Sequence, residues 1–194
     1  MRAFLAVDLH DTLGPVTYGW GQAVARALGP RLASDLTWVA ASRVHVTLRF
    51  LGELAPQQVD AVVHRLAQGP APNSAFDLAI GEAGSFPVHG RPRVLWLGFS
   101  HGRAELAALH AWALESLAGV LDADGRETFS PHLTVARVRP DASPGLGAAL
   151  RAAAARTPAP RGTARIERVT LMESLLSPKG PAYRPVTEFP LSPR

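Results

Sequence analysis

Two short stretches of the chain repeat one pattern, a histidine followed two residues later by a threonine, within a run of aliphatic and β-branched residues. They are His45-Val46-Thr47-Leu48-Arg49-Phe50-Leu51-Gly52 and Pro131-His132-Leu133-Thr134-Val135-Ala136-Arg137. Such runs favour short β-strands, in which residues i and i+2 point to the same face. Each stretch is therefore predicted to hold one imidazole and one hydroxyl side by side on a strand.

The second histidine lies 87 residues after the first, nearly half the length of this 194-residue chain. A single His-x-Thr pair in a strand is most often part of a core. Two copies in similar strands indicate two structurally equivalent halves, each of which contributes one histidine and one threonine to a shared cleft. The four residues are His45, Thr47, His132 and Thr134. By the alternation of a strand, Val46, Leu48 and Phe50 are expected to face the other way, into a core.

The rest of the chain predicts an α+β fold with largely antiparallel sheets in one domain, 1–194. Apolar residues recur at helical spacing in four segments: 12–28, where Asp11 or Thr12 caps the helix, 56–68, 103–119 and 144–155. Strands are expected at 3–9, 36–40, 76–80, 93–99, 164–172 with an irregularity, and 183–189, and a loop at 81–90. Strands outnumber helices without strict βαβ alternation, which favours antiparallel pairing.

Composition narrows the classes of function. The chain has no cysteine, which excludes disulfides, thiol nucleophiles and cysteine-based zinc sites. Its net charge of +4 comes from 20 basic residues, of which only Lys179 is lysine. This charge permits phosphate binding but is too small to demonstrate a nucleic-acid partner. The chain opens in a strand-like run with no leader pattern, and no apolar run approaches the ~20 residues of a membrane span. We therefore expect a cytoplasmic monomer with no membrane partner.

With these motifs the chain resembles the 2H phosphoesterase superfamily, named for two His-x-Thr-x motifs. Within it, the chain is similar to the bacterial and archaeal RNA 2′,3′-cyclic phosphodiesterases, long called 2′-5′ RNA ligases. Besides the motifs, the similarity takes in residues 2–7, 92–96, Glu173-Ser174 and the segment from Ser177 to Tyr183. The resemblance implies two pseudo-symmetric lobes whose sheets line a central cleft, with helices outside.

The resemblance also implies the activity: hydrolysis of RNA 2′,3′-cyclic phosphate ends to 2′-phosphomonoesters, with tRNA fragments among the candidate substrates. A slow, reversible, ATP-independent 2′-5′ ligation of RNA would accompany it. In the resembling enzymes the first-motif histidine protonates the leaving O3′ and the second activates water. This assigns His45 as proton donor and His132 as proton acceptor. The adjacent hydroxyls of Thr47 and Thr134 can donate to the non-bridging phosphate oxygens.

Four further residues are predicted to bind substrate. Arg137 matches the family's basic residue after the second motif, but it is five residues from His132, so an unbroken strand would turn it away from the cleft. Either the strand ends or bulges there, or the side chain reaches round. Phe50 has the same parity problem and can equally be core. Tyr183 and Lys179 border a turn at the predicted cleft mouth, where Tyr183 could stack on a base.

Acid–base hydrolysis by two histidines needs no metal or other cofactor, and we expect none. Three other readings remain open. The cleft could bind RNA ends without turnover, the protein could act on another small cyclic nucleotide, or the two histidines could be metal ligands of a hydrolase. His10 between Asp8 and Asp11 also has the residue types of a metal site, but its place at a strand-to-helix turn favours a local structural role.

Overall fold

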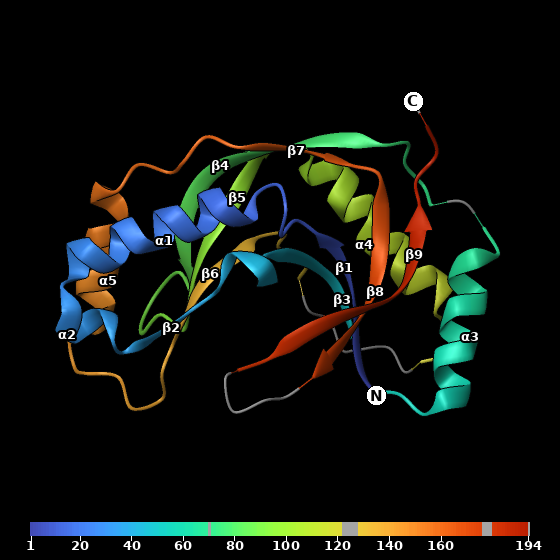
Figure 1. Cartoon of the computed structure of the whole chain (residues 1–194), viewed down its shortest axis with the longest axis horizontal. Helices are drawn as coiled ribbons and strands as arrows, with labels where there is room; N and C mark the ends of the chain where they lie inside the picture. Colours follow the sequence, from blue (N-terminus) through green and yellow to red (C-terminus); the bar gives the residue numbers. More distant parts are fainter. Residues whose placement is uncertain (70, 122–127, 176–179, 194) are drawn as a thin grey trace.

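The computed structural model describes residues 1–69, 71–121, 128–175 and 180–193. Over these residues the chain forms two antiparallel sheets with helices outside them (Figure 1). The elements, in chain order, are β1 (Arg2–Asp8), α1 (Gly14–Leu28), α2 (Pro30–Ala33), β2 (Leu36–Trp38), η1 (Ala41–Arg43), β3 (His45–Glu53), α3 (Pro56–Ala67), β4 (Phe76–Phe86), β5 (Val94–His101), α4 (Arg103–Ser116), β6 (Leu133–Val138), α5 (Leu146–Arg156), β7 (Thr163–Ile166), β8 (Arg168–Leu175) and β9 (Ala182–Pro190). The predicted α+β class with antiparallel sheets is confirmed.

The two motif strands belong to different sheets. Sheet A has the strand order β3-β1-β8-β9 and sheet B the order β2-β6-β5-β4-β7. The first motif lies on β3 at the edge of sheet A, and the second begins just before β6 in sheet B. The strands β3 and β6 contact each other, so the sheets meet where the motifs are. The predicted pair of equivalent halves is therefore present as two lobes.

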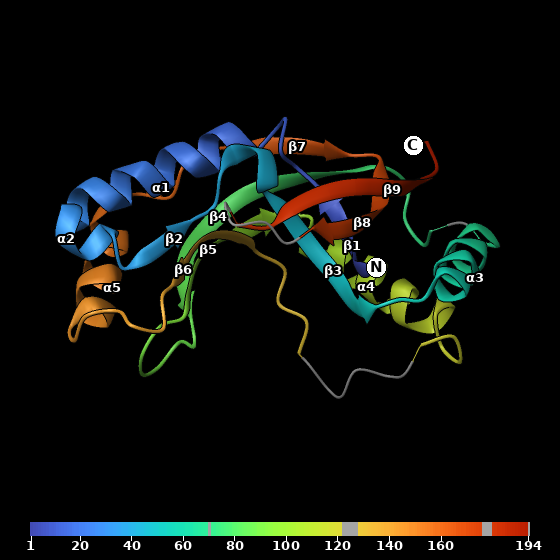
Figure 2. The same ribbon diagram turned by 60° about the horizontal axis from the view of Figure 1, so that its bottom comes forward.

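Each lobe includes a helix that follows a strand of the other sheet. Helix α1 follows β1 of sheet A but packs against β6 and α5, and α4 follows β5 of sheet B but packs against β3. Lobe A thus consists of sheet A with α3 and α4, and lobe B of sheet B with α1, α2 and α5 (Figure 2). The exchange ties the lobes together and brings α4 beside the first motif.

The predicted loop at 81–90 is wrong in its first half, because β4 continues to Phe86. Glycines at 81 and 84 suggested a loop, but each permits close packing within the sheet. A Cβ on Gly84 would overlap the Trp96 ring, and one on Gly81 would lie 2.6 Å from the Ser100 nitrogen. Register shifts around residues 79–83 accommodate the crowding. The extension carries Phe86 to the site described below.

The single irregular strand predicted at 164–172 is instead two strands in different sheets. Strand β7 pairs with β4 in sheet B, β8 pairs with β1 and β9 in sheet A, and Glu167 lies between them. The break in alternation marks the point where the chain changes sheets. The backbone carbonyl of Glu167 accepts a 2.7 Å hydrogen bond from the Leu191 N–H, so the crossing is held by the end of the chain.

The predicted side-chain cap of the first helix is also wrong. Helix α1 begins at Gly14 after Leu13, and no side chain caps it. The hydroxyl of Thr12 instead points back to the Leu9 carbonyl, 3.4 Å away. Gly14 sits so close to η1 that a Cβ would lie 2.6 Å from the Ala41 carbonyl oxygen. Tertiary packing, rather than a polar cap, therefore sets the start of this helix.

One main hydrophobic core runs through both lobes, and a small separate cluster lies under the first motif. The separate cluster consists of Phe4, Ala6 and Met172, with Tyr183 packed against it. Within the described part of the chain, none of the helices is both long and apolar enough to cross a membrane.

Candidate active site

The two motif histidines are held in the same way. The Nδ1 of His45 lies 2.8 Å from the Arg43 carbonyl oxygen, and the Nδ1 of His132 lies 2.7 Å from the Ser130 carbonyl oxygen. A carbonyl only accepts, so Nδ1 is the donor in both rings. In the neutral form each Nε2 is therefore unprotonated and available to exchange a proton.

The surroundings lower the pKa of both imidazoles. For His45 the causes are burial, the Arg137 guanidinium and His132, opposed by the Arg43 carbonyl and the Asp8 carboxylate. For His132 they are burial and Arg137, opposed by the Ser130 carbonyl. The Arg137 guanidinium therefore influences both imidazoles, and His132 influences His45.

The motif threonines lie two residues after their histidines, and Thr47 contacts His45. The Oγ1 of Thr47 is 3.2 Å from the Nε2 of His45, close enough for the hydroxyl to donate to the neutral ring. Thr134 pairs across the sheet with Trp96 on β5 and is partly exposed. Both hydroxyls can turn to a ligand held between the rings.

A bulge in each motif strand resolves the parity problem. In the pairing of β3 with β1, Thr47 lies opposite Ala6 and Arg49 opposite Leu5, which leaves Leu48 as the extra residue. In the pairing of β6 with β5, the register jumps in the same way at Val135. Each of these bulges comes three residues after the motif histidine and reverses the alternation of the residues that follow it. In β3 a second register shift, at Leu51, reverses the alternation again after Phe50.

Phe50 and Arg137, the two residues five positions after the histidines, consequently lie on the histidine side. The side chain of Phe50 is 58% exposed, so the alternative that it is core is wrong. Its ring lies 6.2 Å from Phe4, whose ring is 5.0 Å from His45. Arg137 is exposed and acts on both histidines, as described above.

Each imidazole also meets an aromatic ring edge-on. The ring centroid of Tyr183 lies 5.0 Å from that of His45 at 86°, and the centroid of Phe86 lies 5.1 Å from that of His132 at 80°. Tyr183 thus packs against His45. The role of Phe86 was missed, because the sequence predicted a loop there. The rings exclude water from one side of each histidine, which fits the lowered pKa values.

An acidic side chain also lies near the site. Asp8, at the end of β1, lies opposite His45 in the β1–β3 pairing. Its carboxylate accepts from the Nδ1 of His10 at 2.9 Å, and the Nε2 of His10 lies 3.0 Å from Asp11. The aspartates raise the pKa of His10. Across the described ranges, no group of His, Asp or Glu has the arrangement of a metal site.

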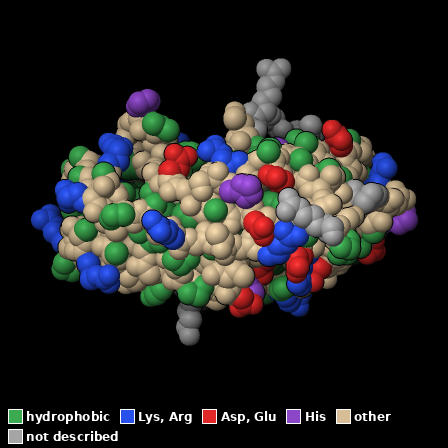
Figure 3. Space-filling model, turned by 90° about the horizontal axis from the view of Figure 1, so that it is seen from above, with side chains coloured by type: hydrophobic (Ala, Val, Ile, Leu, Met, Phe, Trp, Pro, Cys, Tyr) green, Lys and Arg blue, Asp and Glu red, His purple; other side chains and the backbone are tan. Residues whose placement is uncertain are grey.

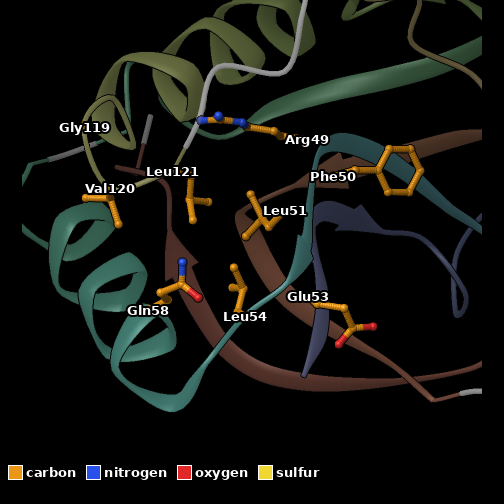
Figure 4. A pocket seen from close by; sticks show the side chains of 9 residues that line it. All are labelled: Arg49, Phe50, Leu51, Glu53, Leu54, Gln58, Gly119, Val120 and Leu121. Atoms are coloured by element: carbon orange, nitrogen blue, oxygen red, sulfur yellow. The ribbon is translucent and has the colours of Figure 1, made fainter.

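A cavity of about 440 Å³ lies next to the site, between β3, the start of α3 and the segment after α4. Its described lining residues are Arg49, Phe50, Leu51, Glu53, Leu54, Gln58, Gly119, Val120 and Leu121. Figure 4 shows Arg49 and Phe50 pointing in opposite directions from β3. None of these lining residues is a motif histidine or threonine, so the cavity is not the cleft itself. Lys179 lies outside the described residues.

Two lobes that each present a histidine and a threonine to one cleft define the 2H phosphoesterase fold. A family profile described as "2'-5' RNA ligase superfamily" matches residues 20–177. The RNA 2′,3′-cyclic phosphodiesterase of Aquifex aeolicus is 33% identical over 78% of this chain and 80% of its own. That of Archaeoglobus fulgidus is 29% identical over 97% and 99%. The chain belongs to the 2′-5′ RNA ligase superfamily.

Solved structures show the same fold. The crystal structure of TT0787 of Thermus thermophilus matches with a TM-score of 0.71 at 25% identity, over 100% of this chain and 99% of that one. The structure of Escherichia coli LigT complexed with 3′-AMP matches with a TM-score of 0.72 at 24% identity, over 98% and 97%. The lobed architecture predicted from the motifs is therefore that of solved relatives.

Proposed function

We propose that the protein hydrolyses RNA 2′,3′-cyclic phosphate ends to 2′-phosphomonoesters by metal-independent acid–base catalysis. The observation that carries the proposal is the pair of histidines, each with Nδ1 donating to a backbone carbonyl, beside one shared arginine. The curated relatives that carry this activity in their names supply the substrate class and the bond that breaks.

In the proposed reaction, His132 takes a proton from water through Nε2 while the water oxygen bonds to phosphorus. The P–O3′ bond breaks on the opposite side, and protonated His45 delivers its proton to O3′. The phosphate stays on O2′. Thr47, Thr134 and Arg137 donate to the non-bridging oxygens, where negative charge grows. In the same direction, with a 5′-hydroxyl in place of water as the nucleophile, these steps give the 2′-5′ ligation.

The aromatic side chains give the cleft a means to hold a nucleoside. Phe50 is exposed and Tyr183 lies beside His45, so both can stack against a base.

The charge of the helices favours binding of the rest of the RNA on lobe B. Its helices carry four arginines and no acidic residue, whereas α3 and α4 carry three acidic residues and two arginines. Figure 3 shows basic side chains around the lobe B end and mixed charges toward lobe A. We propose that a cytoplasmic monomer, acting as one unit over 1–194, takes RNA fragments including those of tRNA.

A short oligonucleotide that ends in a 2′,3′-cyclic phosphate is the substrate to test. Incubation with pure protein in EDTA is expected to open it fully, and the product is expected to be a 2′-phosphate, identified by mass spectrometry and by resistance to a 3′-specific phosphatase. A 3′-phosphate product would contradict the proposed bond cleavage. Binding without turnover would favour an RNA-end binding module, and loss of activity in EDTA would favour metal ligation by the histidines.

Replacing Asp8 with asparagine is expected to move one limb of the pH–rate curve. The Asp8 carboxylate acts to raise the pKa of His45, so its removal lowers that pKa further. A proton donor works below its pKa, and the high-pH limb of kcat/KM should therefore move to lower pH while the low-pH limb stays in place. Asp11→Asn is the matched control, since Asp11 also contacts His10 but does not act on His45. Movement of the low-pH limb instead would reverse the assigned roles.

A further inference from the structure

Helix α4 contacts the first motif at its bulge. The Nδ1 of His110 lies 2.7 Å from the carbonyl oxygen of Leu48, the extra residue in β3. Because the carbonyl only accepts, His110 is the donor. In return, the Nη1 of Arg49 donates to the Ala113 carbonyl on α4 at 3.1 Å. The bulged residue has no residue opposite it in the β1–β3 register, and the helix supplies a hydrogen bond to its carbonyl.

The same imidazole contacts the segment that leads into the second motif. His110 stacks flat on Phe129, with ring centroids 4.3 Å apart and an interplanar angle of 5°. Phe129 is followed directly by Ser130, whose carbonyl orients His132. Residues 128–132 lie outside regular secondary structure, since β6 begins at Leu133. His132 is therefore not held by strand pairing, and the stacking of His110 on Phe129 fixes the coil just before it.

We infer that His110 is a positioning residue that sets the placement of the two motifs relative to each other. The Nδ1 of its ring holds the bulge that turns Phe50 to the cleft, and the stack holds the approach to His132. The inference rests on the proposed function for its kinetic consequence. Misplacement of a catalytic group by about 1 Å can cost about 10²-fold in rate, so loss of both contacts is expected to lower kcat by about 10- to 100-fold.

Three variants separate the contacts. His110→Asn keeps a donor near the position of Nδ1 and removes the stack, His110→Phe keeps the stack and removes the donor, and His110→Ala removes both. Each of the first two is expected to lower kcat for the cyclic phosphate by about tenfold, with KM changed by less than about threefold, and His110→Ala to lower it further. His64→Ala is the control, because His64 pairs only with Gln68 on the outer surface of α3 among its described contacts. Its kcat is expected to be unchanged.

Imidazole NMR spectra of wild type and His110→Ala provide a readout that needs no turnover. The Nδ1–H and Nε2 signals of His132 are expected to shift or broaden in His110→Ala and to keep their positions in His64→Ala. The inference is wrong if kcat and the His132 signals stay as in wild type. It is also wrong if the variants have a lower melting temperature but keep the wild-type kcat at temperatures well below it. An inactive wild type would overturn the proposed function, and the NMR comparison would still decide the role of His110.

Discussion

Replacing either His45 or His132 with alanine is expected to lower kcat/KM for an RNA 2′,3′-cyclic phosphate by roughly 10²–10⁴, the usual worth of a general acid or base. The Nδ1 of each histidine donates to a backbone carbonyl, and Arg137 acts on both rings. Both histidines are therefore expected to take part in the reaction. The wild-type curve of kcat/KM against pH should be bell-shaped. Circular dichroism of each variant would show whether the loss comes from chemistry rather than from unfolding.

A second substrate distinguishes the two roles. When the leaving group has a low pKa, for example in an aryl phosphodiester, departure no longer needs a proton. His45→Ala should then recover much of its activity and lose the high-pH limb, while His132→Ala should stay slow and lose the low-pH limb. Recovery by His132→Ala would reverse the assignment, and recovery by neither would count against acid–base catalysis by this pair.

The two histidine–threonine motifs could be predicted from the sequence because each motif is a local pattern. The spacing of a strand predicts His45 beside Thr47 and His132 beside Thr134. In the structure Thr47 contacts His45, and Thr134 lies on β6 two residues after His132. The antiparallel α+β class followed from composition and periodicity in the same way. These features depend on residues within a few positions of each other, where the rules of strand geometry are strict.

The bulges could not be located in advance. An extra residue changes the face of every residue that follows, and the sequence offered only the incompatibility between Arg137 and an unbroken strand. Two adjacent buried residues in each strand, Leu48 with Arg49 and Val135 with Ala136, are the trace that the bulge leaves. Adjacent apolar residues such as Val135 and Ala136 are common in strands, and the burial of Arg49 cannot be read from its residue type, so this trace does not locate the bulges.

Local sequence patterns could not predict the contacts between distant segments. Phe86 reaches His132 because β4 continues through closely packed glycines, which in sequence resemble a loop. His110 has a weak local signal, since it lies one helical turn from the buried residues Leu106 and Ala113. A polar residue beside an apolar stripe indicates a buried partner, but the Leu48 carbonyl and the Phe129 ring come into reach only once the fold is assembled.

Arg137 is the residue whose loss should move both limbs of the pH–rate curve together. Its guanidinium lowers the pKa of His45 and of His132, so Arg137→Ala raises both values. The base works above its pKa and the acid below its own, and the whole bell should therefore move to higher pH. Loss of the charged donors to the non-bridging oxygens should also lower kcat by roughly 10²–10³.

Two matched variants show whether the effects of Arg137→Ala come from the lost charge or from the lost donor geometry. Arg137→Lys keeps the positive charge but not the planar fork of donors, so the bell should stay in place while kcat falls by less than in Arg137→Ala. Arg139→Ala removes a charge two residues away whose partner is Asp141 and should leave curve and kcat unchanged. If Arg137→Ala moves only one limb, the guanidinium lowers the pKa of only one histidine. Because the Arg137 guanidinium acts on both His45 and His132, a shift of both limbs is the expected result.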